Sequence, residues 1–359
     1  MLLIHGQILF GFFVPHLPWP FSGLLDSKAA VAFFFVLSGF VLHLSFSKTP
    51  FSFASFVGFQ VRRVLRIYPL YYLSLLAVVA AIYLQDRSAF PHFAGNGGGA
   101  TIVLSADHRD IRQWLQQLLL VGPGFDMYFL NPPAWTLAVE MRVAIIFPFL
   151  SWITSGLSFG KGAILLGVSL PLSFLAGRLT HLGFIELIPL FLMGAFFAQH
   201  RSAILKTKIA GWQIFALSAL SLVFYSSRTS VHSLPSVGWY VCGLGSLGFL
   251  VVALRSATVA KFLVRPFLIF LGELSYGIYI LHFAVLLALS TKVSKFHPQA
   301  VIVLFLFGLL LTIGLAFVLY RLIENPFIGL GRKLSDKLKG NVKAVNDMPK
   351  ASSPQTIIG

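Results

Sequence analysis

Four polar side chains interrupt otherwise apolar stretches of the sequence: His5, Ser38, Glu140 and His282. A polar group buried in a bilayer costs free energy, so such residues are candidates for function. Counted from the outer ends assigned below, they lie roughly 9 to 14 Å deep at about 1.5 Å per residue. Four groups at one depth predict a single pocket. The alternative is a set of separate hydrogen bonds between helices.

Histidine is the side chain best suited to remove a proton from a hydroxyl near neutral pH, and a neighbouring carboxylate orients it. We therefore predict that Glu140 supports His5 as a general base. Ser275, Tyr279 and His282 follow one another at helical spacing and form a polar stripe, which indicates a cavity or a partner helix. Neither histidine has a second histidine or a carboxylate at metal-ligand spacing, so no metal is predicted.

Three arginines stand at the mouth of an apolar segment, residues 70–84. Arg62, Arg63 and Arg66 are three and four residues apart, so on a helix their guanidinium groups could converge on one ligand. A forked guanidinium suits a phosphate. The pattern predicts a docking site for a phosphorylated cofactor at the inner membrane surface. The alternative is that the arginines are ordinary anchors of the positive-inside kind.

Composition defines the class of protein. Hydrophobic residues make up 57% of the 359 residues, charged residues only 11%, and the mean hydropathy is +0.86. These values predict an all-α integral membrane protein. The net charge of +16 fits basic loops beside anionic lipid, so we expect membrane lipid and not nucleic acid as a partner. The single cysteine, Cys242, excludes an internal disulfide and a cysteine metal site.

The apolar stretches predict a bundle of about ten transmembrane helices. They cover residues 2–14, 29–46, 64–84, 134–153, 162–177, 184–199, 209–225, 237–254, 267–290 and 300–323. The first is short and lacks the basic region and cleavage site of a signal peptide. We expect it to be the outer part of a truncated helix.

Lys and Arg are about twice as frequent in one set of alternate loops and the C-terminal tail as in the other set, which predicts that both termini are cytoplasmic. The long loop 85–133 is then external. Its amphipathic run, residues 114–121, is expected to lie in the interface or to dip into the protein. Residues 1–328 form the expected membrane domain, and residues 329–359 a basic cytoplasmic tail expected to be disordered.

Several segments together resemble the bacterial acyltransferase-3 family of membrane O-acyltransferases, over nearly the whole length up to about residue 328. The matching segments are residues 3–5 (LIH), 31–40 (VAFFFVLSGF), 62–69 (RRVLRIYP), 134–140 (AWTLAVE), 274–282 (LSYGIYILH) and 324–326 (ENP). Their joint order and spacing carry the resemblance.

The resemblance implies transfer of an acyl group, usually acetyl from acetyl-CoA, to a hydroxyl of a cell-surface glycan or glycolipid at the bacterial inner membrane. Acyl-CoA would be a donor substrate, with no permanently bound cofactor. The family's key histidine matches His5. Its companion arginine, ten residues earlier, would fall before Met1. We expect a misassigned start, which the short first helix favours; the alternative is a defective or altered member of the family.

In this interpretation Arg62, Arg63 and Arg66 hold the acyl-CoA phosphates. His5, Glu140 and His282 are catalytic, and Ser38, Ser275 and Tyr279 contact substrate. Three alternatives stay open: a transporter or flippase of a lipid-linked saccharide, a membrane scaffold without catalysis, and N-acetylation of an amino sugar.

Overall fold

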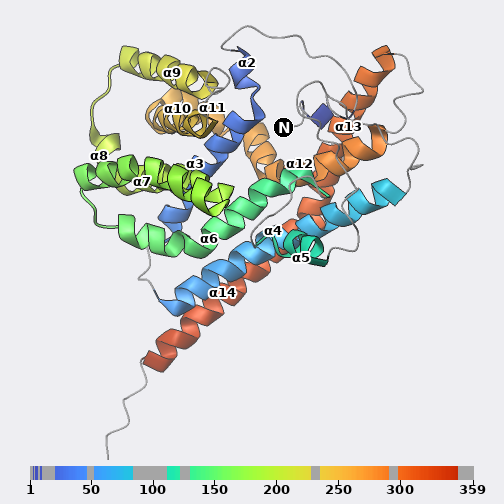
Figure 1. Cartoon of the computed structure of the whole chain (residues 1–359), viewed down its shortest axis with the longest axis horizontal. Helices are drawn as coiled ribbons and strands as arrows, with labels where there is room; N and C mark the ends of the chain where they lie inside the picture. The colour runs from blue at the N-terminus through green and yellow to red at the C-terminus, as the bar shows by residue number, and fades with distance from the viewer. Residues whose placement is uncertain are drawn as a thin grey trace, which may run out of the picture.

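The computed structural model describes residues 3, 5, 6, 9, 21–46, 52–83, 111–121, 130–227, 235–290 and 298–346, and within these ranges its regular structure is all helical. The elements are α2 (Phe21–Leu24), α3 (Ser27–Phe46), α4 (Phe53–Tyr83), α5 (Ile111–Leu119), η2 (Pro132–Ala134), α6 (Trp135–Thr154), α7 (Phe159–Thr180), η3 (Gly183–Leu187), α8 (Ile188–Lys206), α9 (Gly211–Ser226), α10 (Pro235–Arg255), α11 (Ala257–Leu263), α12 (Pro266–Ser290), α13 (Pro298–Leu319), the π-helix η6 (Tyr320–Glu324) and α14 (Asn325–Asn346) (Figure 1).

The described chain has eight helical segments long and apolar enough to cross a membrane, which confirms an all-α membrane bundle. Each of the eight corresponds to one of the ten predicted stretches. The stretch 209–225 forms α9, which at 16 residues is shorter than these spans. Most of the first stretch, residues 2–14, lies outside the described residues; those of its positions that are described are helical.

The helices form two groups, with α6 between them (Figure 1). In one group α3, α8, α9 and α10 surround an apolar core, and α7 covers α8. In the other group α4, α12 and α13 pack together with the N-terminal helical residues, for example through Leu9 and Phe305. Because α6 contacts both α3 and α4, it places its side chains at the junction of the two groups.

Two glycines let α3 and α8 approach closely. A Cβ at Gly39 would collide with the backbone carbonyl of Phe191, and one at Gly194 with that of Val36. Small residues at such crossings are how membrane helices gain van der Waals contact, since lipid supplies no hydrophobic force between them. The crossing therefore depends on the absence of side chains at these two positions.

The amphipathic run in the long loop forms α5, whose C-terminal end enters the protein. Three successive carbonyls, those of Gln117, Leu118 and Leu119, accept hydrogen bonds from the hydroxyls of Tyr71, Tyr72 and Tyr68, respectively. These bonds satisfy carbonyls that a helix end leaves without internal partners. The following Leu120 is buried in the core around α4 and α12. The end of this run therefore packs into the protein, while Leu115, Leu118 and Leu119 are exposed.

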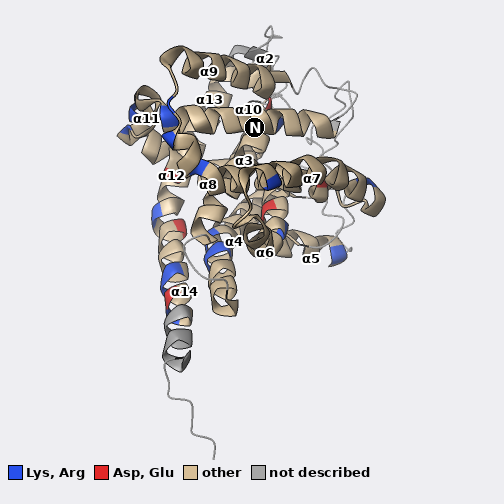
Figure 2. Cartoon of the chain, turned by 90° about the vertical axis from the view of Figure 1, so that its left-hand side faces the viewer, with Lys and Arg blue, Asp and Glu red and all other residues tan. Residues whose placement is uncertain are grey.

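The structure corrects the prediction that the whole C-terminal tail is disordered. Residues 329–346 belong to α14, which packs along α4, and both helices project from the bundle in both views (Figures 1 and 2). Small residues one turn apart make this possible: Gly331 lies against Arg62 and Leu65, and the buried Ser335 against Gly58. Residues 347–359 lie outside the described range.

We predict that Gly194→Ala lowers stability by about 1 to 3 kcal/mol, because the added methyl group overpacks the α3–α8 crossing. Thermal unfolding in detergent, followed by tryptophan fluorescence, measures the change. Gly167→Ala is the matched control, since a Cβ at this position on α7 would meet no atom within 4 Å. Equal melting temperatures for both variants would contradict the close crossing.

Candidate active site

Two histidines from distant parts of the sequence meet in the second helix group. Nδ1 of His5 lies 2.8 Å from Nε2 of His282, and the rings stack with centroids 5.0 Å apart. Both side chains are buried, and the ring of Phe283 packs edge-on against His5. The prediction that these two histidines share a site is thus supported by direct contact.

The hydrogen bonds of the pair define where its protons lie. Nδ1 of His282 is 2.6 Å from the carbonyl oxygen of Tyr279. A carbonyl only accepts, so this nitrogen carries the proton and Nε2 of the neutral His282 ring has a lone pair. That lone pair accepts from Nδ1–H of His5. The proton of neutral His5 is therefore on Nδ1, and its Nε2 carries a lone pair that can act as a base.

Glu140 does not occupy the place predicted for it beside His5. Its carboxylate forms an ion pair with Arg63 of α4, and both side chains are largely buried, with exposed fractions of 11% and 13%. A charge in an apolar environment is stable only with a partner, so the charge of each residue allows the other to be buried. His282 and the Tyr279 carbonyl, not a carboxylate, orient His5. The predicted depth of Glu140 in the membrane does not determine which side chain it contacts.

Tyr279 links the histidines to the start of α6. Its hydroxyl donates to the carbonyl of Pro133 and lies 2.8 Å from the hydroxyl of Thr136. Its ring centroid is 6.0 Å from that of His282. The carboxylate of Glu140 lies within electrostatic range of Tyr279. Tyr279 thus positions His282 through its backbone carbonyl, while its hydroxyl bonds to residues of η2 and α6. Sequence reasoning missed Thr136, although it lies within the segment 134–140 already noted.

Two other predicted substrate contacts lie away from the histidine pair. Ser275 is exposed, and its hydroxyl donates to the Gly272 carbonyl of its own helix. Ser38 is half-buried on α3, which packs mainly against α8 and α10. The single pocket predicted from depth therefore divides: the two histidines come together, Glu140 lies beside Arg63, and Ser38 lies in the other helix group.

The three arginines do not converge on one point, in contrast to the prediction. Arg62 donates to the hydroxyl of Ser335 on α14, and Arg63 is paired with Glu140. Arg66 is exposed and lies within electrostatic range of Glu324 in the π-helix. Arg66 is thus exposed, whereas Arg62 and Arg63 are partly buried and bonded to other helices.

A basic surface forms instead where α4 meets the junction of the π-helix and α14. Tyr320 lies within electrostatic range of Arg66 and of the exposed Arg332. Figure 2 shows further lysines and arginines along α14. Glu273 and Glu324 also lie within electrostatic range of Tyr320. The surface is therefore mixed in charge, but it contains two exposed guanidinium groups, those of Arg66 and Arg332. The sequence did not predict a role for Arg332, because this residue falls in the segment predicted to be a disordered tail.

Among the described residues no cluster of three or more His, Cys, Asp or Glu side chains is placed to bind a metal.

The comparison with known families defines the class of protein. The sequence model of a family described as an acyltransferase domain matches residues 1–321. The chain therefore belongs to the acyltransferase-3 family and is a multi-pass membrane acyltransferase that acts on groups other than aminoacyl groups. The transporter and scaffold alternatives are set aside on this ground. The comparisons with curated proteins and with solved structures found no match.

We predict that Arg63→Ala destabilises the protein by about 3 to 5 kcal/mol, because it leaves the Glu140 carboxylate buried without its partner. Thermal unfolding in detergent measures the loss. The double variant Arg63→Met with Glu140→Met removes both charges and is expected to recover most of it. A double variant no more stable than Arg63→Ala would contradict the pairing.

Proposed function

We propose that the protein transfers an acyl group, most simply acetyl, from acyl-CoA to a hydroxyl of a cell-surface glycan or glycolipid. We place it in a bacterial inner membrane with both termini cytoplasmic, as the charge of the alternate loops favours. The observation that carries the proposal is the directed hydrogen-bond chain from His5 through His282 to the Tyr279 carbonyl. This chain leaves one basic nitrogen for the acceptor.

In the proposed step Nε2 of His5 removes the proton from the acceptor hydroxyl while the hydroxyl oxygen attacks the thioester carbonyl carbon. The new carbon–oxygen bond forms, the carbon–sulfur bond breaks, and the CoA sulfur takes the proton from His5. Products are the ester and free CoA. During the transfer His5 becomes a cation, which the lone pair of the neutral His282 ring stabilises through the bond from Nδ1.

The donor would bind at the basic surface of Arg66 and Arg332, where guanidinium groups can pair with the CoA phosphates. Its pantetheine arm would then follow α12 toward the histidines. Glu273, beside this surface, and His282 are nine residues apart on α12, which is about 13.5 Å along the axis at 1.5 Å per residue. An extended arm spans such a distance. Compared with the sequence-based prediction, Arg66 keeps its role, and Arg332 replaces Arg62 and Arg63.

The experiment that tests the proposal measures transfer of labelled acetyl from acetyl-CoA to glycans in membranes that contain the protein. Labelled ester on a glycan, removable by mild base, supports O-acylation. Base-stable label would indicate N-acetylation of an amino sugar. Absence of label over a wide range of glycan acceptors, with the protein folded, would overturn the proposed function.

We predict that His5→Ala reduces kcat by about 10²- to 10⁴-fold, the usual contribution of a general base. Binding of acetyl-CoA is expected to stay intact and can be measured separately by equilibrium dialysis. His181→Ala is the control, since this histidine is exposed at the end of α7. Undiminished turnover by His5→Ala would exclude His5 as the base.

We predict that His282→Ala lowers kcat with little change in either KM, because His5 loses the acceptor that directs its proton. His282→Gln offers a side-chain oxygen as an acceptor and is expected to recover part of the rate. Steady-state kinetics of the two variants measures the difference. A purely structural role would predict equal losses in both.

We predict that Arg66→Ala and Arg332→Ala each raise the KM for acetyl-CoA, by about 10-fold for loss of one charge-assisted contact. Arg112→Ala, an exposed arginine in the first turn of α5, is the matched control. Initial rates at varied acetyl-CoA give the result. Unchanged KM in both test variants would place the donor phosphates elsewhere.

A further inference from the structure

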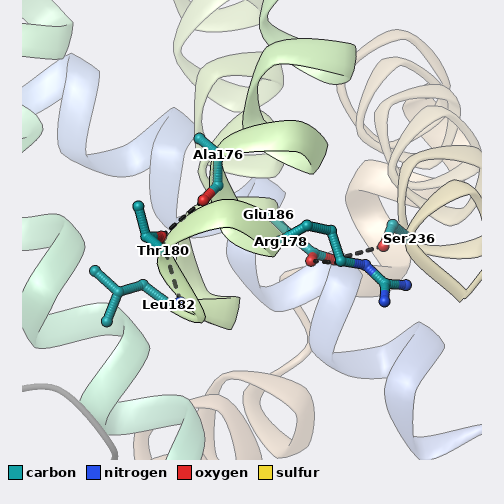
Figure 3. A network of polar contacts seen from close by, with 6 residues as sticks. All are labelled: Ala176, Arg178, Thr180, Leu182, Glu186 and Ser236. Atoms are coloured by element: carbon teal, nitrogen blue, oxygen red, sulfur yellow. Dashed lines mark hydrogen bonds and ion pairs between the residues drawn. The ribbon is translucent and has the colours of Figure 1, made fainter.

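A second polar group lies across α6 from the histidine pair, where α7, η3 and α10 meet. The hydroxyl of Ser236 donates to one carboxylate oxygen of Glu186, and Nε of Arg178 lies 3.9 Å from the other (Figure 3). Gly177 makes room for this arrangement, since a Cβ there would lie 2.5 Å from Cγ of Glu186. The carboxylate is thus held in place by three elements.

The contacts leave hydrogen-bonding capacity unused. Arg178 is 64% exposed, and Figure 3 shows its terminal nitrogens pointing away from Glu186, which is itself 19% exposed. The charge of Glu186 is therefore only weakly compensated. One oxygen accepts from Ser236, and a carboxylate can accept several bonds in all.

Tyr240 supplies an independent observation. Its side chain is only 8% exposed, and its hydroxyl has no hydrogen-bond partner among the described residues. Tyr240 follows Ser236 by four positions on α10, so the two lie on one face of the helix. The phenol is within electrostatic range of Glu186. A buried hydroxyl without a partner costs about 1 to 3 kcal/mol, which a ligand that completes its bonds would remove.

The chemistry of the three groups selects the kind of ligand. A carboxylate accepts hydrogen bonds, and the hydroxyls of serine and tyrosine both donate and accept. A phosphate would be repelled by the weakly compensated charge of Glu186. A neutral molecule with several hydroxyls meets every one of these groups favourably, which is the property of a saccharide.

A tryptophan pair lies at the contact between α10, which carries Ser236 and Tyr240, and α6, which contacts the histidine group. Trp239, adjacent to Tyr240, has its ring centroid 6.2 Å from that of Trp135 at the start of α6. The next residue, Thr136, lies 2.8 Å from the Tyr279 hydroxyl, and the Tyr279 ring is 6.0 Å from His282. Aromatic faces suit the apolar faces of sugar rings, while hydroxyl and carboxylate groups suit their edges.

From these contacts we infer that Glu186, Ser236 and Tyr240 form an acceptor subsite that binds the hydroxyls of a saccharide, with Trp239 and Trp135 between it and the reacting histidines. The inference deepens the proposed function and rests on it. In this arrangement Glu186 and Tyr240 hold one sugar while the hydroxyl to be acylated points toward His5. Specificity follows, because a site built of buried polar groups rejects an analogue that leaves them without partners.

The test uses the full chain in detergent or nanodiscs, with acetyl-CoA and methyl glucoside, methyl galactoside or methyl rhamnoside as acceptors. Tyr240→Phe is expected to raise the acceptor KM about 3- to 10-fold, and Glu186→Gln about 10- to 100-fold, the losses typical of a neutral and a charged hydrogen bond. The KM for acetyl-CoA is expected to stay unchanged. Tyr72→Phe is the matched control, since its hydroxyl bonds a backbone carbonyl of α5 on the other side of the bundle.

Singly deoxygenated glycosides sharpen this test. For the glycoside that lacks the hydroxyl bound by Tyr240, the wild-type protein and Tyr240→Phe should have equal KM values, because the same bond is missing in both. Fully additive losses for every deoxy position, or an unchanged acceptor KM in both variants, would overturn the subsite.

Saccharide binding, followed by tryptophan fluorescence, separates this inference from the proposed function. Binding that Tyr240→Phe weakens, without any acetyl transfer, would support the subsite and overturn the acyl-transfer proposal. Acetyl transfer to a saccharide with no effect of either substitution would overturn the subsite alone. Acylation of 1-octanol in place of every glycoside, with no saccharide binding, would also overturn it.

Discussion

The Arg63–Glu140 ion pair is the interaction on which the arrangement of the bundle depends. It joins α4, which belongs to the helix group around the histidines, to α6, which also contacts the other group. Gln60 adds a hydrogen bond from α4 to the Ala144 carbonyl one turn further along α6. Because neither charge is stable alone in an apolar environment, the two helices can adopt only a register that keeps the pair together. That register brings Thr136 to Tyr279 and so aligns α6 with the histidines.

Around this register the polar groups of the bundle divide into sites with different chemistry. In the histidine pair the direction of the hydrogen bonds is set by the Tyr279 carbonyl. Because a carbonyl cannot donate, it fixes the tautomers of both neutral rings. The exposed Arg66 and Arg332 lie near Tyr320 and Glu273, at the N-terminal part of α12, and the group of Glu186 and Tyr240 lies across α6. A donor and an acceptor approaching from these two directions would meet at His5 without competing for the same surface.

Much of this architecture follows from sequence, because the length of an apolar segment in a bilayer is a strong constraint. The eight described spans were predictable, and so was the meeting of His5 and His282, since polar groups in such segments are rare and tend to pair. Their partners were not. Depth along a helix places Glu140 at a level of the membrane, but only the packing of α4 on α6 decides that it meets Arg63 and not His5. The helix α14 was missed because its contact face consists of small residues, Gly331 and Ser335, within a basic segment that resembles a disordered tail.

α13, the π-helix and α14 form one continuous helix, so a small tilt at the base of α14 moves its far end by several ångströms. The 22 residues of α14 extend about 33 Å, so a tilt of about 10° at its base displaces the tip by about 6 Å. Since α14 packs along α4, Arg332 and Arg66 travel together during such a tilt. A force applied to α14 outside the bundle would thus be transmitted to the transmembrane helices. The distance between the guanidinium groups of Arg66 and Arg332 would be preserved.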